Sequence, residues 1–110
     1  MKRMKYASSD RNKIDSSWCI NKVGICISFA IAIDVLSLEE IDEFGKQFMK
    51  TVKSTFGKFL DSYCYSKTDT PVISATNNGG LIMLWSFQAE NNKNVVELLK
   101  ECGIKQVKYD

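Results

Sequence analysis

The sequence predicts a single α+β domain whose elements follow the order strand, helix, strand, strand, helix, strand. Two observations carry this prediction: large and small residues alternate over residues 23–35, and a capped apolar stripe with helical spacing follows from Ser37. The chain has 110 residues, which is near the common size of one domain. Its 45% hydrophobic and 25% charged residues are ordinary for a globular protein, so we expect one hydrophobic core.

The first strand is predicted over residues 23–35. Successive side chains of a strand point to opposite faces, so the alternation places the large apolar residues on one side and the small ones on the other. Just before it, Trp18 and Ile20 are large residues at even positions, which requires a bulge or a tight turn in between. The small or polar even positions of the strand are Gly24, Cys26, Ser28, Ala30, Ala32 and Asp34.

A long helix is predicted to begin at Ser37. Ser37 and Glu40 have the spacing of a capping box, in which each side chain binds a free backbone amide of the other residue. The following apolar residues recur every three or four positions, which lines them along one side of a helix of about seven turns. They are Ile41, Phe44, Phe48, Met49, Val52, Phe56, Phe59, Leu60 and Tyr63.

The second half of the chain predicts a hairpin, a short helix and a last strand. Pro71 opens an edge strand at residues 72–76, and residues 77–80, Asn-Asn-Gly-Gly, form the turn into a strand at 81–87. Asn91 or Asn92 caps the second helix, and Gly103 ends it. Residues 104–109 then form the last strand.

This order matches the ferredoxin-like split βαβ arrangement (βαββαβ), a four-stranded antiparallel sheet with two helices on one face. Residues 23–35 and 81–87 would be its central pair. Residues 1–16, with a net charge of +3, are predicted to be a basic, flexible arm, and residues 17–110 to be the domain. Two alternatives stay open for the other face of the sheet: it is free for a partner, or residues 14–20 fold over it as a fifth strand or cover.

The residues that usually build a catalytic or metal site are sparse. There is no histidine, and the four cysteines, Cys19, Cys26, Cys64 and Cys102, contain no CxxC pair, so zinc spacing and the usual general base are both absent from the sequence. We therefore predict a non-enzymatic protein with no catalytic residues, no metal and no cofactor, in which the thiols are free.

The location is predicted to be cytoplasmic, without a membrane partner. Lys2, Arg3 and Lys5 resemble the start of a signal peptide, but polar residues 8–13 stand where its apolar stretch would have to be. The longest apolar run, residues 25–36, contains Asp34 and is shorter than the roughly 20 residues that a spanning helix needs.

The function predicted by elimination is a small protein-binding module: an inhibitor, immunity or regulatory protein that occludes a protein partner or pairs with a second copy as a homodimer. The sheet face away from the helices would carry small residues that allow close approach of another surface. The predicted partner-binding residues are Cys26, Ser28, Ala30, Ala32, Ile82 and Leu84.

Two other functions are weighed against it. Nucleic acid would be held by the basic arm and by bases stacked on Trp85 and Phe87, although residues 78–83 lack the basic-glycine-aromatic pattern of RNA recognition sheets. The residues of that arm are Lys2, Arg3, Lys5, Arg11 and Lys13. The element order is also similar to that of ligand-sensing domains of the ACT type, which implies a metabolite near the first strand and helix, but residues 34–37 lack the expected glycine and asparagine.

Overall fold

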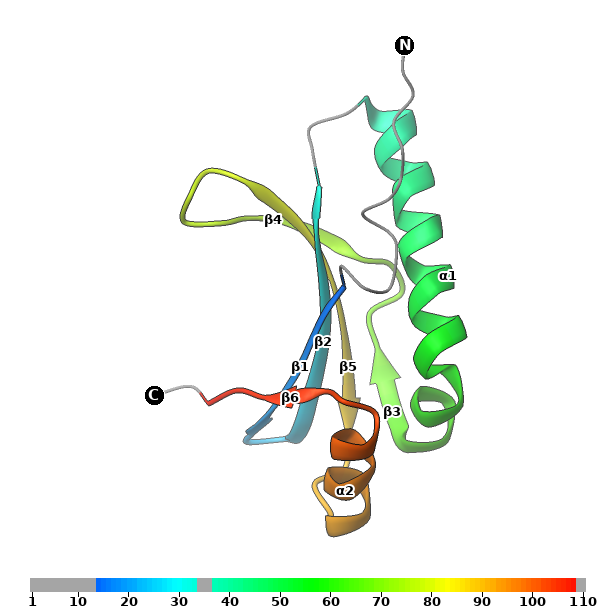
Figure 1. The fold of residues 1–110 in the computed structure, drawn as a ribbon, viewed down its shortest axis with the longest axis vertical. Helices are drawn as coiled ribbons and strands as arrows, with labels where there is room; N and C mark the ends of the chain where they lie inside the picture. The colour runs from blue at the N-terminus through cyan, green and yellow to red at the C-terminus, as the bar shows by residue number, and fades with distance from the viewer. Residues whose placement is uncertain (1–13, 34–36, 109–110) are drawn as a thin grey trace.

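A computed structural model describes residues 14–33 and 37–108 and shows a six-stranded sheet with two helices packed against one face (Figure 1). The predicted α+β class is therefore confirmed. The elements are β1 (Asp15–Asn21), β2 (Gly24–Ile33), α1 (Leu38–Tyr63), β3 (Cys64–Lys67), β4 (Val72–Ala75), β5 (Leu81–Ala89), α2 (Lys93–Glu101) and β6 (Lys105–Gln106).

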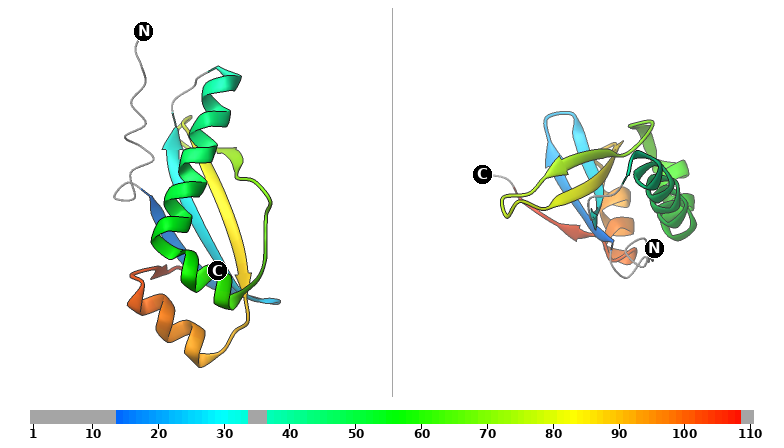
Figure 2. Two further views of the ribbon diagram at one scale, coloured as in Figure 1. Left: turned by 90° about the vertical axis from the view of Figure 1, so that its right-hand side faces the viewer. Right: turned by 90° about the horizontal axis from the view of Figure 1, so that it is seen from above.

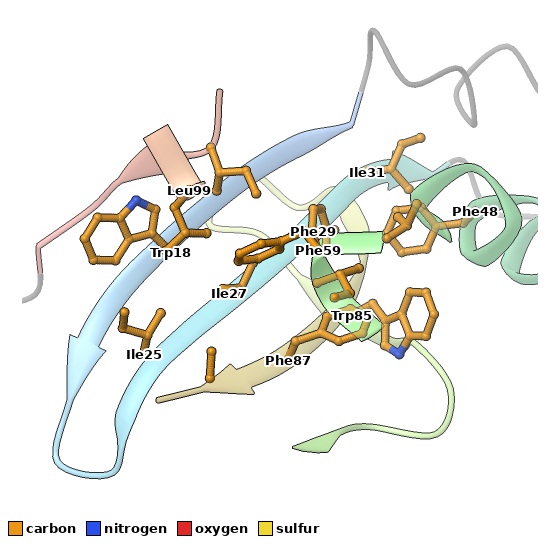
Figure 3. Packing of buried hydrophobic residues seen from close by; sticks show 14 of the residues in the cluster. Trp18, Ile25, Ile27, Phe29, Ile31, Phe48, Phe59, Trp85, Phe87 and Leu99 are labelled. Atoms are coloured by element: carbon orange, nitrogen blue, oxygen red, sulfur yellow. The ribbon is translucent and has the colours of Figure 1, made fainter. Parts of the chain in front are cut away.

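Strand β2 is the centre of the sheet, and its odd residues are the centre of the core. Ile25, Ile27 and Phe29 are completely buried, and β2 pairs antiparallel with β5 along its whole length. The predicted alternation is confirmed from Gly24 to Ile33, and so is the predicted central pair. Val23, predicted as the first residue of this strand, instead lies in the turn before it and is 65% exposed. Figure 3 shows these side chains in one cluster with Trp85 and Phe87 of β5. The predicted strand residues Asp34 and Val35 lie outside the described residues.

Helix α1 begins with the predicted capping box and covers β2 and β5 (Figure 2). The Glu40 backbone N–H donates to Ser37 Oγ at 3.2 Å, and the Ser37 N–H donates to Glu40 Oε1 at 3.1 Å. Gly45 faces the sheet, where a Cβ would make an ordinary contact of 3.6 Å with the Met83 methyl group. The buried residues of the helix are Phe44, Gly45, Phe48, Val52, Phe59 and Leu60.

The sheet differs from the predicted four-stranded arrangement because β1 pairs with β2. The segment at residues 14–20, which the sequence left open as a fifth strand or a cover, forms an extra N-terminal strand beside β2, and a tight turn at Lys22 and Val23 joins the two. Strand β6 therefore lies one position further out and runs parallel to β1 at Ser17 and Trp18. The order across the sheet is β3-β5-β2-β1-β6, with β4 also paired to β5.

The edge beside β5 is built from two short strands. Strand β3, which the sequence did not indicate, pairs with the end of β5, and β4 pairs with its beginning. Between them the Trp85 indole N–H donates to the Thr68 carbonyl at 2.7 Å. The hairpin of β4 and β5 closes as predicted: the Thr76 N–H donates to the Gly80 carbonyl at 2.9 Å, and Gly79 has a φ of +84°.

Helix α2 lies on the same side of the sheet as α1, at one end (Figure 2). Of the two predicted caps the structure uses Asn92, whose Oδ1 accepts from the Val95 N–H at 3.0 Å. Val95 and Leu99 are buried, and Leu99 belongs to the same core cluster as Trp18. The predicted last strand at residues 104–109 is shorter, because only Lys105–Gln106 pair and residue 109 is outside the described residues.

Gly24, the first residue of β2, is predicted to be intolerant of any side chain. Its φ is +136°, and an added Cβ would lie 2.7 Å from the Ala89 carbonyl oxygen. Gly24→Ala should therefore lower the free energy of unfolding by about 1 to 3 kcal/mol, measured by urea denaturation. Gly57 is the control: it is helical with nothing within 4 Å of its Cβ position, so Gly57→Ala should stabilise by up to about 1 kcal/mol. Equal stability of Gly24→Ala and the wild type would contradict the prediction.

Candidate functional site

The six predicted partner-binding residues lie together on the face of the sheet opposite the helices, which we call the open face. In the pairing of β2 with β5, Ala30 lies opposite Leu84, and Ala32 lies opposite Ile82. Side chains of directly paired residues share a face and are neighbours. The same pairing continues the row with Ser28 opposite Ser86 and Cys26 opposite Gln88. The prediction that these positions form one surface is therefore correct in its geometry.

The open face is wider than the sequence indicated, because the neighbouring strands extend it. Val72 of β4 pairs with Leu84, and Ser74 pairs with Ile82. On the other side, Asp15, Ser17 and Cys19 of β1 pair with Ala30, Ser28 and Cys26, so the exposed Asp15 carboxylate also lies on this face. The sequence could not assign these residues to the face, since their side depends on the register between strands rather than on the alternation within one strand.

The open face divides into an apolar half and a weakly polar half. The apolar half contains Ala30, Ala32, Ile82, Leu84 and Val72, of which Ala32 and Val72 are exposed and the other three half-buried. Antiparallel sheets with one solvated face usually place polar residues there, so this row of apolar side chains on the solvent side is unusual.

The weakly polar half consists of hydroxyl, thiol and amide groups. The Ser28 and Ser86 hydroxyl oxygens are 3.5 Å apart, and Cys26 Sγ is 4.0 Å from Ser28 Oγ. The Gln88 Oε1 atom is buried and has no hydrogen-bond partner among the described residues. None of the outward-facing residues of β2 and β5 is charged. On β2 and β5 this half therefore offers a few short polar groups and no charge, while Lys105 of β6, paired with Ser17, brings a positive charge to its edge.

The thiols do not have the environment of catalytic nucleophiles. Burial, and then the neighbouring Cys26, raise the pKa of Cys19; burial, and then Glu101, raise the pKa of Cys102. Burial, followed by the Asp61 carboxylate, raises the pKa of Cys64 from 9.0 to about 11. A nucleophilic cysteine needs a lowered pKa instead. Residues 14–33 and 37–108 contain no group of three or more cysteine, aspartate and glutamate side chains able to hold a metal ion.

The aromatic residues suggested as a nucleic-acid surface belong to the core. Trp85 and Phe87 are 1% and 3% exposed and face the helices, so neither can stack on a base, which is a correction to that prediction. The reason is register: both pair with odd residues of β2, Phe29 and Ile27, and so share the core face. The basic arm residues Lys2, Arg3, Lys5, Arg11 and Lys13 lie outside the described residues.

Comparison of the chain with models of protein families, with curated proteins and with solved structures found no match. In the described part of the chain, neither helix combines the length and the apolar character needed to cross a membrane. The physical character of the open face is accordingly the basis for proposing a function.

The raised pKa of Cys64 predicts a loss of stability in alkali. The folded chain holds the Cys64 proton up to about pH 11, whereas the unfolded chain releases it near pH 9.0, so the free energy of unfolding should fall as pH rises through this window. Cys64→Ala removes this contribution, so the free energy of unfolding of the variant should fall less steeply with pH than that of the wild type. The two slopes should differ by at most about 1.4 kcal/mol per pH unit. Urea denaturation of both proteins between pH 8 and 11 measures the two slopes, and the lysines and tyrosines common to both cancel. Identical slopes would contradict the assignment.

Proposed function

We propose that the chain is a non-enzymatic protein-binding module that acts through the open face, as an inhibitor, immunity or regulatory protein that occludes a protein partner or a second copy of itself. The observation that supports this is the uncharged, small-residue surface of β2 and β5, with the apolar half at one end. The four cysteines are free thiols, which suits the cytoplasmic location that we also propose.

The side chains of the open face favour close approach of a second surface. Ala30 and Ala32 extend only one carbon atom from the backbone, so a partner can lie directly on the sheet without displacing long side chains. The centres of protein interfaces are depleted of charged residues, and this face has none on its two central strands. Lysine or glutamate side chains on these two strands would have made removal of the face from water unfavourable.

The hairpin of β4 and β5 gives this surface a raised border. In Figure 1 the hairpin projects away from α1, to the side of the sheet that carries the open face. Val72 is 52% exposed, and its partner in the sheet, Leu84, is half-buried on the same face. A partner seated on Ala30 and Ala32 would therefore also meet these larger apolar groups, which supply most of the buried apolar area.

Ala30→Arg tests the proposal. The arginine side chain would point away from the helices, so the domain should keep its fold and its circular dichroism spectrum. It should lose at least about tenfold in affinity, because the long side chain, beside the Asp15 carboxylate that pairs with this position, would hold a partner away from the sheet. Thr55→Arg, on the exposed surface of α1, is the matched control and should bind like the wild type.

The measurement is light scattering behind gel filtration, together with capture of proteins from a cell lysate. The expected result is a dimer or a retained protein for the wild type and Thr55→Arg, and its loss for Ala30→Arg. A strictly monomeric wild type that retains no protein, or equal binding by Ala30→Arg, would refute the proposal. Binding centred on the uncharged side chains of β2 and β5 should also change little with salt, whereas binding to nucleic acid would weaken steeply.

A further inference from the structure

Two of the four cysteines lie directly opposite each other in the sheet. In the antiparallel pairing of β1 with β2, Cys19 is the partner of Cys26. Residues paired in this way have Cα atoms about 4.5 or about 5.5 Å apart, and their side chains lie on the same face. Disulfides span Cα separations of about 4.4 to 6.8 Å, so the backbone already holds these two thiols within bonding range.

The two thiols differ in access to solvent. Cys26 is half-buried on the open face, whereas Cys19 is 8% exposed. The other two cysteines are in different places: Cys64 follows α1 and pairs with Ala89, whose side chain is completely buried, and Cys102 ends α2. Within the Cys19–Cys26 pair, an oxidant would thus reach Cys26 first, and Cys19 is the thiol opposite it.

We propose that Cys19 and Cys26 form a reversible intramolecular disulfide when the protein meets a small-molecule disulfide such as oxidised glutathione. The Cys26 thiolate attacks one sulfur of the oxidant, which forms a mixed disulfide and releases one glutathione. The Cys19 thiolate then attacks the Cys26 sulfur, which forms the Cys19–Cys26 bond and releases the second glutathione. The protein loses two electrons and two protons, and the oxidant is reduced to two thiols.

The attack of Cys19 on the mixed disulfide controls how the rate of disulfide formation depends on pH. Burial and the neighbouring Cys26 raise the pKa of Cys19, so less of its reactive thiolate is present at neutral pH. Two charged residues lie on the same face near the thiol pair. Asp15 of β1 pairs with Ala30, two cross-strand pairs away from Cys19 and Cys26 on this face. Lys105 of β6 pairs with Ser17, which is one cross-strand pair away. In the described part of the chain, Gln88 is the residue of β5 opposite Cys26 and is neutral. Disulfide formation should therefore become faster between about pH 7 and 9.

Tryptic mapping of the full chain tests this proposal. The protein is incubated with oxidised glutathione, its remaining thiols are blocked, and it is digested without a reductant. Cleavage after Lys22 separates the two cysteines, which then lie in peptides 14–22 and 23–46, while Cys64 and Cys102 lie in peptides 59–67 and 101–105. The expected product is the linked pair 14–22 with 23–46, which dithiothreitol separates. The number of free thiols should fall from four to two.

Matched variants distinguish the pair from general oxidation. Cys64→Ser combined with Cys102→Ser should still give the linked peptides at the wild-type rate. Cys19→Ser should instead keep glutathione on Cys26, because the thiol that displaces it is gone. The proposal is overturned if the wild type carries only glutathione adducts, or if the linked peptides contain Cys64, Cys102 or two copies of Cys26. The wild-type map alone decides this even where a variant fails to fold.

Discussion

The burial of one side of β2 is the constraint on which the rest of the structure depends. Ile25, Ile27 and Phe29 are fully buried, and each such side chain contributes about 1.5 to 3 kcal/mol on leaving water. Because the strand alternates, burying these residues turns Cys26, Ser28, Ala30 and Ala32 to the opposite side at the same time. The core and the open face are thus two consequences of one pattern.

The position of β1 shows how chain connectivity decides between strands that compete for the same edge. The last strand of a four-stranded arrangement would pair with β2, but it reaches the sheet only after α1, the hairpin and α2. Strand β1 is joined to β2 by two residues, so closing that loop costs little conformational entropy. Trp18 adds a large buried side chain to the core. Strand β6 is left with the outer edge of β1 and two paired residues.

The same hairpin connects the two proposals about the open face. Because β1 lies beside β2, the face gains Ser17 and Cys19, and Cys19 comes to lie against Cys26. The apolar half, at Ala30, Ala32 and Val72, lies toward the other end of β2. A small apolar surface and a pair of thiols are therefore parts of one face, although each proposal depends on different residues.

Local patterns in the sequence determined β2, the capped start of α1, the β4–β5 turn and the shared face of the six residues predicted to bind a partner, because alternation, capping and turn chemistry act over a few neighbouring residues. Only the tertiary structure decided that β3 forms at Cys64–Lys67 and that Cys19 meets Cys26. The turn at Lys22 and Val23 lacks the Asn-Gly signal of a hairpin, so the register of β1 could not be derived from it. The position of β3 and the register of β1 arise from pairing between distant or adjoining segments. The stability of such pairing depends on which strands meet and in which register, and this cannot be read from the sequence of either strand alone.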